Sequence, residues 1–285
     1  MSQPHQAAST LLIWAILLPC TTTAERIEDA EPQSSRSIKV ALVQFDAVPE
    51  KVAHNLNEME GLARTAVAHG ARWVMFHEGC LTDYTPRVDE LAEPVPDGPS
   101  CQRMMRLAKE LECTISFGLS ERDGVKRYIT QVFFGPAGLV TKYRKSWLWR
   151  CDDKGYRNEW ARYDTGTGPE LFQIDGIAAT CFICADGSAP RCIERARLVS
   201  PEVVFYPNNR ADLPDFPVFG AYAARIGAPM LVTNRVGMSW DYKCQGGCVI
   251  FDASGNVLAK ANREGEEEIL YYSLIIPADG DLKND

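Results

Sequence analysis

Three side chains that can do chemistry stand at the ends of apolar, strand-like stretches of the sequence. Glu78 ends WVMFHE, Lys145 ends VTKYRK and Cys184 ends CFIC. Sites in α/β proteins are commonly built where strands end, because the loops there are free of the core. Each residue alone is more often a solvated or core side chain, so the prediction rests on the combination. A carboxylate and an ammonium beside a thiol suit nucleophilic catalysis.

The stretches around these residues alternate between strand and helix patterns. Apolar residues at helical spacing predict helices over 55–70, 100–112, 191–200 and 217–228. Runs rich in β-formers predict strands in 38–45, 71–78, 113–121, 128–145, 170–184, 203–207, 230–237, 247–260 and 267–276. This alternation, with hairpins at 135–138 and 253–256, predicts one α/β domain with a mixed sheet or paired sheets covered by helices. The Trp- and Arg-rich segment 146–169 has no period, and irregular segments of that length are often functional.

Size and charge exclude some classes of function. The chain has 285 residues, enough for one large core, with ordinary globular fractions of 46% hydrophobic and 24% charged residues. Its formal net charge is −8 and its pI about 5.2, so a nucleic-acid role has little electrostatic support.

The N-terminus differs in kind from the rest. Residues 11–19, LLIWAILLP, form an apolar run well below the roughly 20 residues that span a bilayer. The run and the small residues before Glu25 predict a signal peptide at 1–24, or an uncleaved membrane anchor, although no Lys or Arg precedes it. A linker at 25–36, the domain at 37–277 and a flexible tail at 278–285 complete the division. The protein is expected to be exported, periplasmic or extracellular, if the signal is real, and cytoplasmic otherwise.

The cysteines leave two readings open. Removing Cys20 with the signal leaves nine of the ten; one free nucleophile then leaves eight, enough for four disulfides in an oxidising compartment. Reduced, buried cysteines are the equal alternative. The pairs Cys181/Cys184 and Cys244/Cys248 invite zinc, but CFIC lacks a turn glycine and strand residues three apart face opposite sides. No metal site is predicted, and His77 on a strand should point away from Glu78, which disfavours histidine catalysis.

The three stretches together resemble the motifs of the nitrilase superfamily, the carbon–nitrogen hydrolases that use a Glu-Lys-Cys triad. His77-Glu78 resembles the family's Pro-Glu, residues 143–148 (YRKSWL) resemble YRKxHL, and residues 183–186 (ICAD) resemble ICYD or ICWD. Residues 234–237 (NRVG) and 251–257 (FDASGNV) also match family features. The departures are His77 for proline, Trp147 for histidine, and residues 188–191 (SAPR) for RFPE.

The resemblance implies a four-layer α-β-β-α sandwich that pairs into a homodimer or a higher homo-oligomer. It implies Cys184 as nucleophile, Glu78 as general base, and Lys145 with the backbone N–H of Ala185 as donors to the oxyanion. Glu159 is the candidate second carboxylate that orients Lys145. No metal, nucleotide or organic cofactor is implied.

The expected activity is hydrolysis of a non-peptide C–N bond in a small amide or carbamoyl substrate. The superfamily's nitrilases typically follow the cysteine with Trp-Glu, whereas Ala185-Asp186 is closer to the amidase and carbamoylase branches. A nitrilase, an N-acyltransferase and a non-catalytic small-molecule-binding protein remain alternatives.

Two local expectations concern the surroundings of the nucleophile. Asn208, Asn209 and Arg210 follow the strand 203–207 and are expected near the pocket mouth, where Arg210 binds either a substrate carboxylate or a surface acid. Strand alternation is expected to turn Cys181 away from the site, and Gly187-Ser188 to let the chain turn sharply after Cys184.

Overall fold

The computed structural model describes residue 1 and residues 35–151 and 158–276. The predicted signal peptide or anchor (1–24), the flexible tail (278–285) and nearly all of the linker (25–36) lie outside the described residues. Among the helices described, none has the length and apolar character needed to cross a membrane.

Two six-stranded sheets form the centre of the molecule, in the orders β14-β1-β2-β3-β4-β5 and β13-β12-β9-β8-β7-β6. The first contains β1 (Arg36–Gln44), β2 (Trp73–Met75), β3 (Thr114–Asp123), β4 (Lys126–Gly135), β5 (Gly138–Arg144) and β14 (Glu268–Ile276). The second contains β6 (Phe172–Ile174), β7 (Ile177–Cys181), β8 (Val203–Pro207), β9 (Met230–Thr233), β12 (Val249–Phe251) and β13 (Val257–Lys260). The three central strands of each sheet are parallel and the outer ones antiparallel, so both sheets are mixed.

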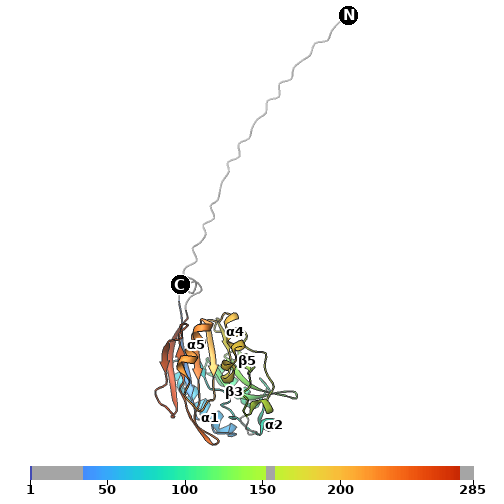
Figure 1. Cartoon of the computed structure of the whole chain (residues 1–285), viewed down its shortest axis with the longest axis vertical. Coiled ribbons are helices and arrows are strands. Elements are labelled where there is room, and N and C mark those ends of the chain that lie inside the picture. Colours follow the sequence, from blue (N-terminus) through green and yellow to red (C-terminus); the bar gives the residue numbers. More distant parts are fainter. Residues whose placement is uncertain (2–34, 152–157, 277–285) are drawn as a thin grey trace.

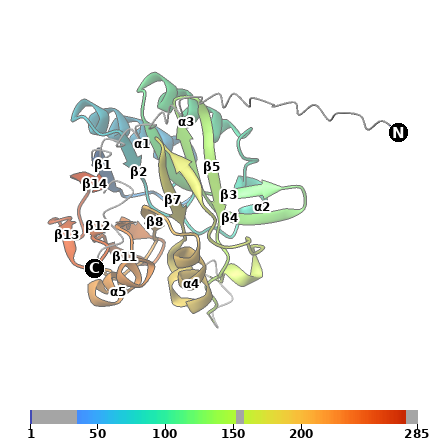
Figure 2. The ribbon, with the colours of Figure 1, turned by 90° about the horizontal axis from the view of Figure 1, so that it is seen from above.

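Helices cover the outer face of each sheet. The helices α1 (Val52–Ala68) and α3 (Pro99–Glu110) pack on the first sheet, and α4 (Pro190–Leu198) and α5 (Phe216–Ile226) on the second (Figures 1 and 2). Strand β1 shows why: Val40 and Leu42 join the core between the sheets, while Ala41 and Val43 join the core beneath α1 and α3. A strand buried on both faces reads as a continuous apolar run. The predicted four-layer sandwich is confirmed.

Several element boundaries differ from the sequence prediction. The first helix begins at Val52 rather than 55 and ends at Ala68, just before Gly70 at φ +85°. The strand expected over 230–237 is interrupted after Thr233, and its second part pairs with an unpredicted strand in the ribbon β10 (Val236–Ser239) and β11 (Tyr242–Gln245). Short elements are α2 (Val88–Leu91) and the 3-10 turns η1 (Glu159–Ala161) and η2 (Cys184–Ser188).

The described part of the irregular segment 146–169 contains only the turn η1, and residues 152–157 lie outside the described residues.

Candidate active site

Three buried charged side chains meet where separate segments of the chain converge. The Lys145 Nζ lies 2.7 Å from Glu78 Oε1 and 2.7 Å from Glu159 Oε1. Each of the three side chains is at most 1% exposed. Glu159 is therefore not the solvated loop acid that its irregular surroundings would allow. The remaining oxygen of Glu159 accepts a hydrogen bond from the Trp149 N–H at 2.6 Å, which fixes the carboxylate.

Glu78 is carried by the segment that follows β2. Strand β2 ends at Met75, and the Phe76 N–H still donates to Ser116 O of β3. Where the segment crosses β3, a Cβ at Gly118 would lie 2.2 Å from the backbone nitrogen of Gly79. Only glycine fits there, since backbone atoms on both sides cannot give way. This close packing sets the position of Glu78.

Cys184 lies in a different local structure from the one its sequence predicts. Strand β7 ends at Cys181, and Cys184 is the first residue of η2, with φ at +42°. Such a φ is uncommon for a residue with a Cβ and clusters at functional sites. The strand-alternation argument that separated Cys181 from Cys184 is therefore wrong, because the strand has ended before Cys184. Cys181 is still buried, in the core between the sheets.

The sequence predicts that Gly187 allows a sharp turn after Cys184, and that reason is also wrong. The left-handed residue of the turn is Cys184 and not Gly187. Glycine is needed at 187 because a Cβ there would lie 2.4 Å from the hydroxyl oxygen of Tyr206. That hydroxyl donates to Cys184 O at 2.7 Å, so the close approach holds the nucleophile turn.

Asp186 ties this turn to the segment that carries Lys145. Its buried carboxylate accepts hydrogen bonds from the N–H groups of Ile183 (2.9 Å), Ser146 (3.0 Å) and Trp147 (2.6 Å) and from the Tyr143 hydroxyl (2.7 Å). Burial raises the pKa of Asp186, and these donors oppose that effect. Asp186 therefore holds Cys184 and Lys145 in register, a role that its place in the motif did not specify.

Burial and neighbouring charges set the protonation of the site. Burial raises the pKa of Glu78 to about 7, with Lys145 lowering it and Glu159 raising it. Burial together with the negative charge of Glu78 raises the pKa of the Cys184 thiol to about 12. Burial alone would lower the pKa of Lys145, but Glu159 and Glu78 outweigh it and raise the pKa well above its usual value. The site thus rests as a thiol beside a carboxyl group that titrates near neutrality, with a permanent ammonium.

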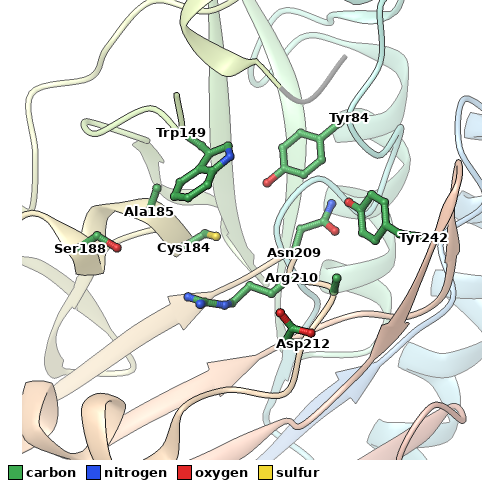
Figure 3. Close-up of a pocket in the computed structure, with 10 residues that line it drawn as sticks. Tyr84, Trp149, Cys184, Ala185, Ser188, Asn209, Arg210, Asp212 and Tyr242 are labelled. Carbon is green, nitrogen blue, oxygen red and sulfur yellow. The ribbon is translucent and has the colours of Figure 1, made fainter. Parts of the chain in front are cut away.

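A cavity of about 300 Å³ opens beside the thiol (Figure 3). Its lining includes four of the predicted residues, namely Cys184, Ala185, Asn209 and Arg210. Asn208 does not line it; that side chain is buried and its Nδ2 donates to Tyr206 O at 2.8 Å. The other lining residues are Tyr84, Trp149, Ser188, Ala211, Asp212 and Tyr242.

The walls of the cavity include aromatic residues that the sequence did not predict. The Tyr84 hydroxyl lies 3.3 Å from Glu78 Oε2, and Trp149 follows Lys145 by four positions. Both stand in loops just after a predicted catalytic residue, which is the signal that could have found them. Tyr242 lies on the unpredicted strand β11, and nothing in its local pattern points to the site.

Other chemistries find no support in the described part of the chain. No group of His, Cys, Asp and Glu side chains among the described residues could hold a metal ion. The close pairs Cys181/Cys184 and Cys244/Cys248 form no disulfide. Burial lowers the pKa of His77 to about 3, and its Nδ1 lies 2.8 Å from Glu78 O, so His77 is a neutral core side chain.

Comparison with known proteins agrees with the geometry. The family model described as carbon-nitrogen hydrolase matches residues 39–277. A nitrilase of Pyrococcus abyssi is 28% identical over 237 residues, which cover 81% of this chain and 87% of the relative. An N-carbamoylputrescine amidase of Solanum lycopersicum is 27% identical over 221 residues, covering 72% and 73%.

A solved structure supports the fold. An amidase of the nitrilase superfamily from Nesterenkonia superposes with a TM-score of 0.76 at 20% identity, covering 89% of this chain and 96% of the other. The resemblance drawn from the three motifs is confirmed, since the family model spans most of the chain. The protein belongs to the carbon–nitrogen hydrolase family and is a hydrolase.

Proposed function

We propose that the protein hydrolyses the C–N bond of a small amide or carbamoyl compound through a thioester on Cys184. One observation carries the proposal. Lys145 is held 2.7 Å from both Glu78 and Glu159, and the charge of Glu78 acts on the Cys184 thiol, which lines a cavity of about 300 Å³. A thiol, a base of suitable pKa and a cation at one small cavity are the parts that acyl transfer needs.

In the first half-reaction, Cys184 Sγ attacks the substrate carbonyl carbon and its proton passes to Glu78. The tetrahedral oxyanion lies toward Lys145 and the Ala185 N–H, and removal of one such donor commonly costs about 3–4 kcal/mol of barrier. The C–N bond then breaks, and the nitrogen takes the proton from Glu78 and leaves as ammonia or an amine.

In the second half-reaction, Glu78 takes a proton from water, whose oxygen attacks the thioester carbon. The C–S bond breaks, Sγ recovers the proton from Glu78 and the acid leaves. A base with a pKa near the working pH serves both steps, and a pKa of about 7 for Glu78 meets this condition. Glu159 holds Lys145 in place. None of these steps needs a metal or an organic cofactor.

A nitrile substrate is the second candidate, favoured by the similarity to a nitrilase. The same thiol would attack a nitrile carbon. An N-acyltransferase would differ only in the acceptor of the acyl group. Ala185-Asp186 after the cysteine favours the amidase and carbamoylase branches over both.

The proposal includes a homodimer or higher homo-oligomer, as in the family that the motifs resemble. Leu198 at the end of α4 and Val218 on α5 are 65% and 42% exposed, apolar surface that a second copy would cover. A single monomer mass by light scattering across micromolar concentrations contradicts it.

We also propose that the protein is exported and that a signal peptide is cleaved before residue 25. The N-terminal mass of the secreted protein tests this.

The test of the proposed function is ammonia release over matched amide, ureido and nitrile compounds, with protein that starts at residue 25. Amides or ureido compounds should be hydrolysed with release of ammonia. Mass spectrometry should detect the acyl adduct that they form on Cys184. Turnover of nitriles alone contradicts the branch, and turnover that survives in Cys184→Ala contradicts the site.

A further inference from the structure

Arg210 places in the cavity a positive charge that has no acidic partner among the described residues. It lies in the loop after β8, is partly buried and lines the cavity. In Figure 3 its side chain extends toward the part of the cavity that holds Cys184 and Ser188. No carboxylate of the described residues lies within 4.0 Å of its guanidinium. By contrast, Arg144 is paired with Glu121, and the buried Arg235 with Asp83.

The main chain of Arg210 is anchored, and its guanidinium lies against an aromatic ring. The backbone N–H of Arg210 donates to Asn234 Oδ1 at 2.9 Å, and the guanidinium carbon lies 5.3 Å from the centre of the Phe219 ring. Its charge acts on Cys184: burial and Glu78 raise the pKa of that thiol, while Lys145 and Arg210 oppose them. Because Arg210 and Cys184 line the same cavity, the guanidinium is placed to contact a substrate bound beside the nucleophile.

The acid in the same wall is a weaker candidate for charge recognition. Asp212 also lines the cavity, but it is exposed to solvent, where an ion pair with a ligand contributes little. A guanidinium that is partly desolvated forms stronger, bidentate hydrogen bonds to a carboxylate. Arg210 should therefore bind a charged ligand more strongly than Asp212 does, which favours an anionic ligand over a cationic one.

We propose that the substrates are short amides or ureido compounds that carry a carboxylate, and that Arg210 binds this carboxylate. The inference rests on the proposed hydrolysis and assigns its substrate class. The cavity volume limits the substrate to a short chain between the two groups. Arg210 is a specificity-determining residue and takes no part in bond breaking.

The kinetic test uses ω-amide and ω-ureido acids of two to five carbons, their methyl esters, and the analogues that carry an amine in place of the acid. The acids should exceed their esters in kcat/KM by at least about tenfold, and Arg210→Gln should bring this ratio to about one. Arg210→Glu should make the amine analogue the better substrate. The control, Arg225→Gln, removes an exposed arginine of α5 and should keep the ratio.

Two results overturn the inference. One is an acid-to-ester ratio that Arg210→Gln leaves unchanged. The other is a preference for the amine analogue that disappears in Asp212→Asn. An intact preference in Asp212→Asn together with its loss in Arg210→Gln supports it.

A binding measurement separates this inference from the proposed function. Calorimetry with Cys184→Ala and the dicarboxylates succinate or glutarate requires no turnover. Dicarboxylate binding that is lost in the Cys184→Ala/Arg210→Gln double variant supports the anion site. If the wild type then hydrolyses none of the compounds, only the hydrolysis proposal fails. Absence of binding beside turnover of neutral amides overturns the anion site alone.

Discussion

Two clusters of buried charges in this protein differ in how completely they are satisfied. The structural cluster is Asp83, Arg235 and Ser239, and the reactive cluster is Glu78, Lys145 and Glu159. In the structural cluster one carboxylate meets one guanidinium at 2.5 Å. Its other carboxylate bonds come from Ser239 Oγ, the Tyr84 N–H and Asn209 Nδ2. Both oxygens of Asp83 have partners. A second acid, Asp46, lies 3.6 Å from the guanidinium but is 43% exposed, so the buried charges of this cluster balance one to one.

The reactive cluster has two carboxylates for one ammonium. Burial raises the pKa of Glu78 to about 7; Lys145 lowers the pKa, and the second carboxylate, Glu159, raises it again, which leaves Glu78 ready to exchange a proton with the thiol. The comparison teaches that burial of charge does not by itself mark a site. An unbalanced cluster with an exchangeable proton does, while a balanced one holds loops in place, here the two loops that carry Tyr84 and Asn209.

The largest effect is expected from Cys184→Ala, which removes the nucleophile beside the reactive cluster. Activity should fall to background, while the melting temperature stays near that of the wild type because a small side chain at the cavity wall is lost. Cys181→Ala is the control; it should keep most turnover and lose about 1 kcal/mol of unfolding free energy from a buried site. An active Cys184→Ala beside an inactive, folded Cys181→Ala contradicts the site.

Glu78→Gln should sharpen the difference between the clusters. It removes the base and the surplus charge without changing the shape, so kcat should fall about 10²–10⁴-fold. The unfolding free energy at pH 8 should not fall, because a buried carboxylate with a raised pKa is replaced by a neutral group. Steady-state kinetics and urea unfolding check both, and a strongly destabilised Glu78→Gln would count against an unbalanced cluster.

Asp83→Asn should have the opposite signature. It leaves the buried guanidinium of Arg235 without its one buried acidic partner, so that only the half-exposed Asp46 remains near it, which should lower the unfolding free energy by about 3–5 kcal/mol. Turnover per folded molecule should fall less than in Glu78→Gln, because Asp83 acts only through Tyr84 and Asn209. Urea unfolding followed by kinetics on the folded fraction tests this, and a stable but inactive Asp83→Asn would reverse the assignment of the two clusters.

The smallest expected effect is a shift of the pH profile. The ionised form of Glu78 accepts the thiol proton, so log kcat/KM should rise with pH and level off above a midpoint near 7. No fall is expected at mildly alkaline pH, because the pKa of Cys184 is raised to about 12. In Glu159→Gln one cause that raises the pKa of Glu78 is gone, so the residual activity should show a midpoint at lower pH. A midpoint that moves upward contradicts the charge argument.

The sequence by itself determined the elements and the reactive residues. Apolar runs such as that of β1 and the helical spacing in α1 are local patterns, so strands, helices and the α/β class follow from them, whereas the four-layer sandwich was implied by the motif resemblance. The types and order of Glu78, Lys145 and Cys184 indicate the chemistry. The motif resemblance added Glu159, which the structure places 2.7 Å from Lys145.

Only the tertiary structure decided how these residues meet. The left-handed Cys184, the hydrogen bonds that tie Asp186 to the segment of Lys145, and the fit of Gly118 against Gly79 depend on which strands lie side by side. So does the split between Asn208, which turns into the core, and Asn209, which lines the cavity. Neighbouring residues share a local pattern, but the sheet order brings different partners to each, and that order is a long-range property of the packed chain.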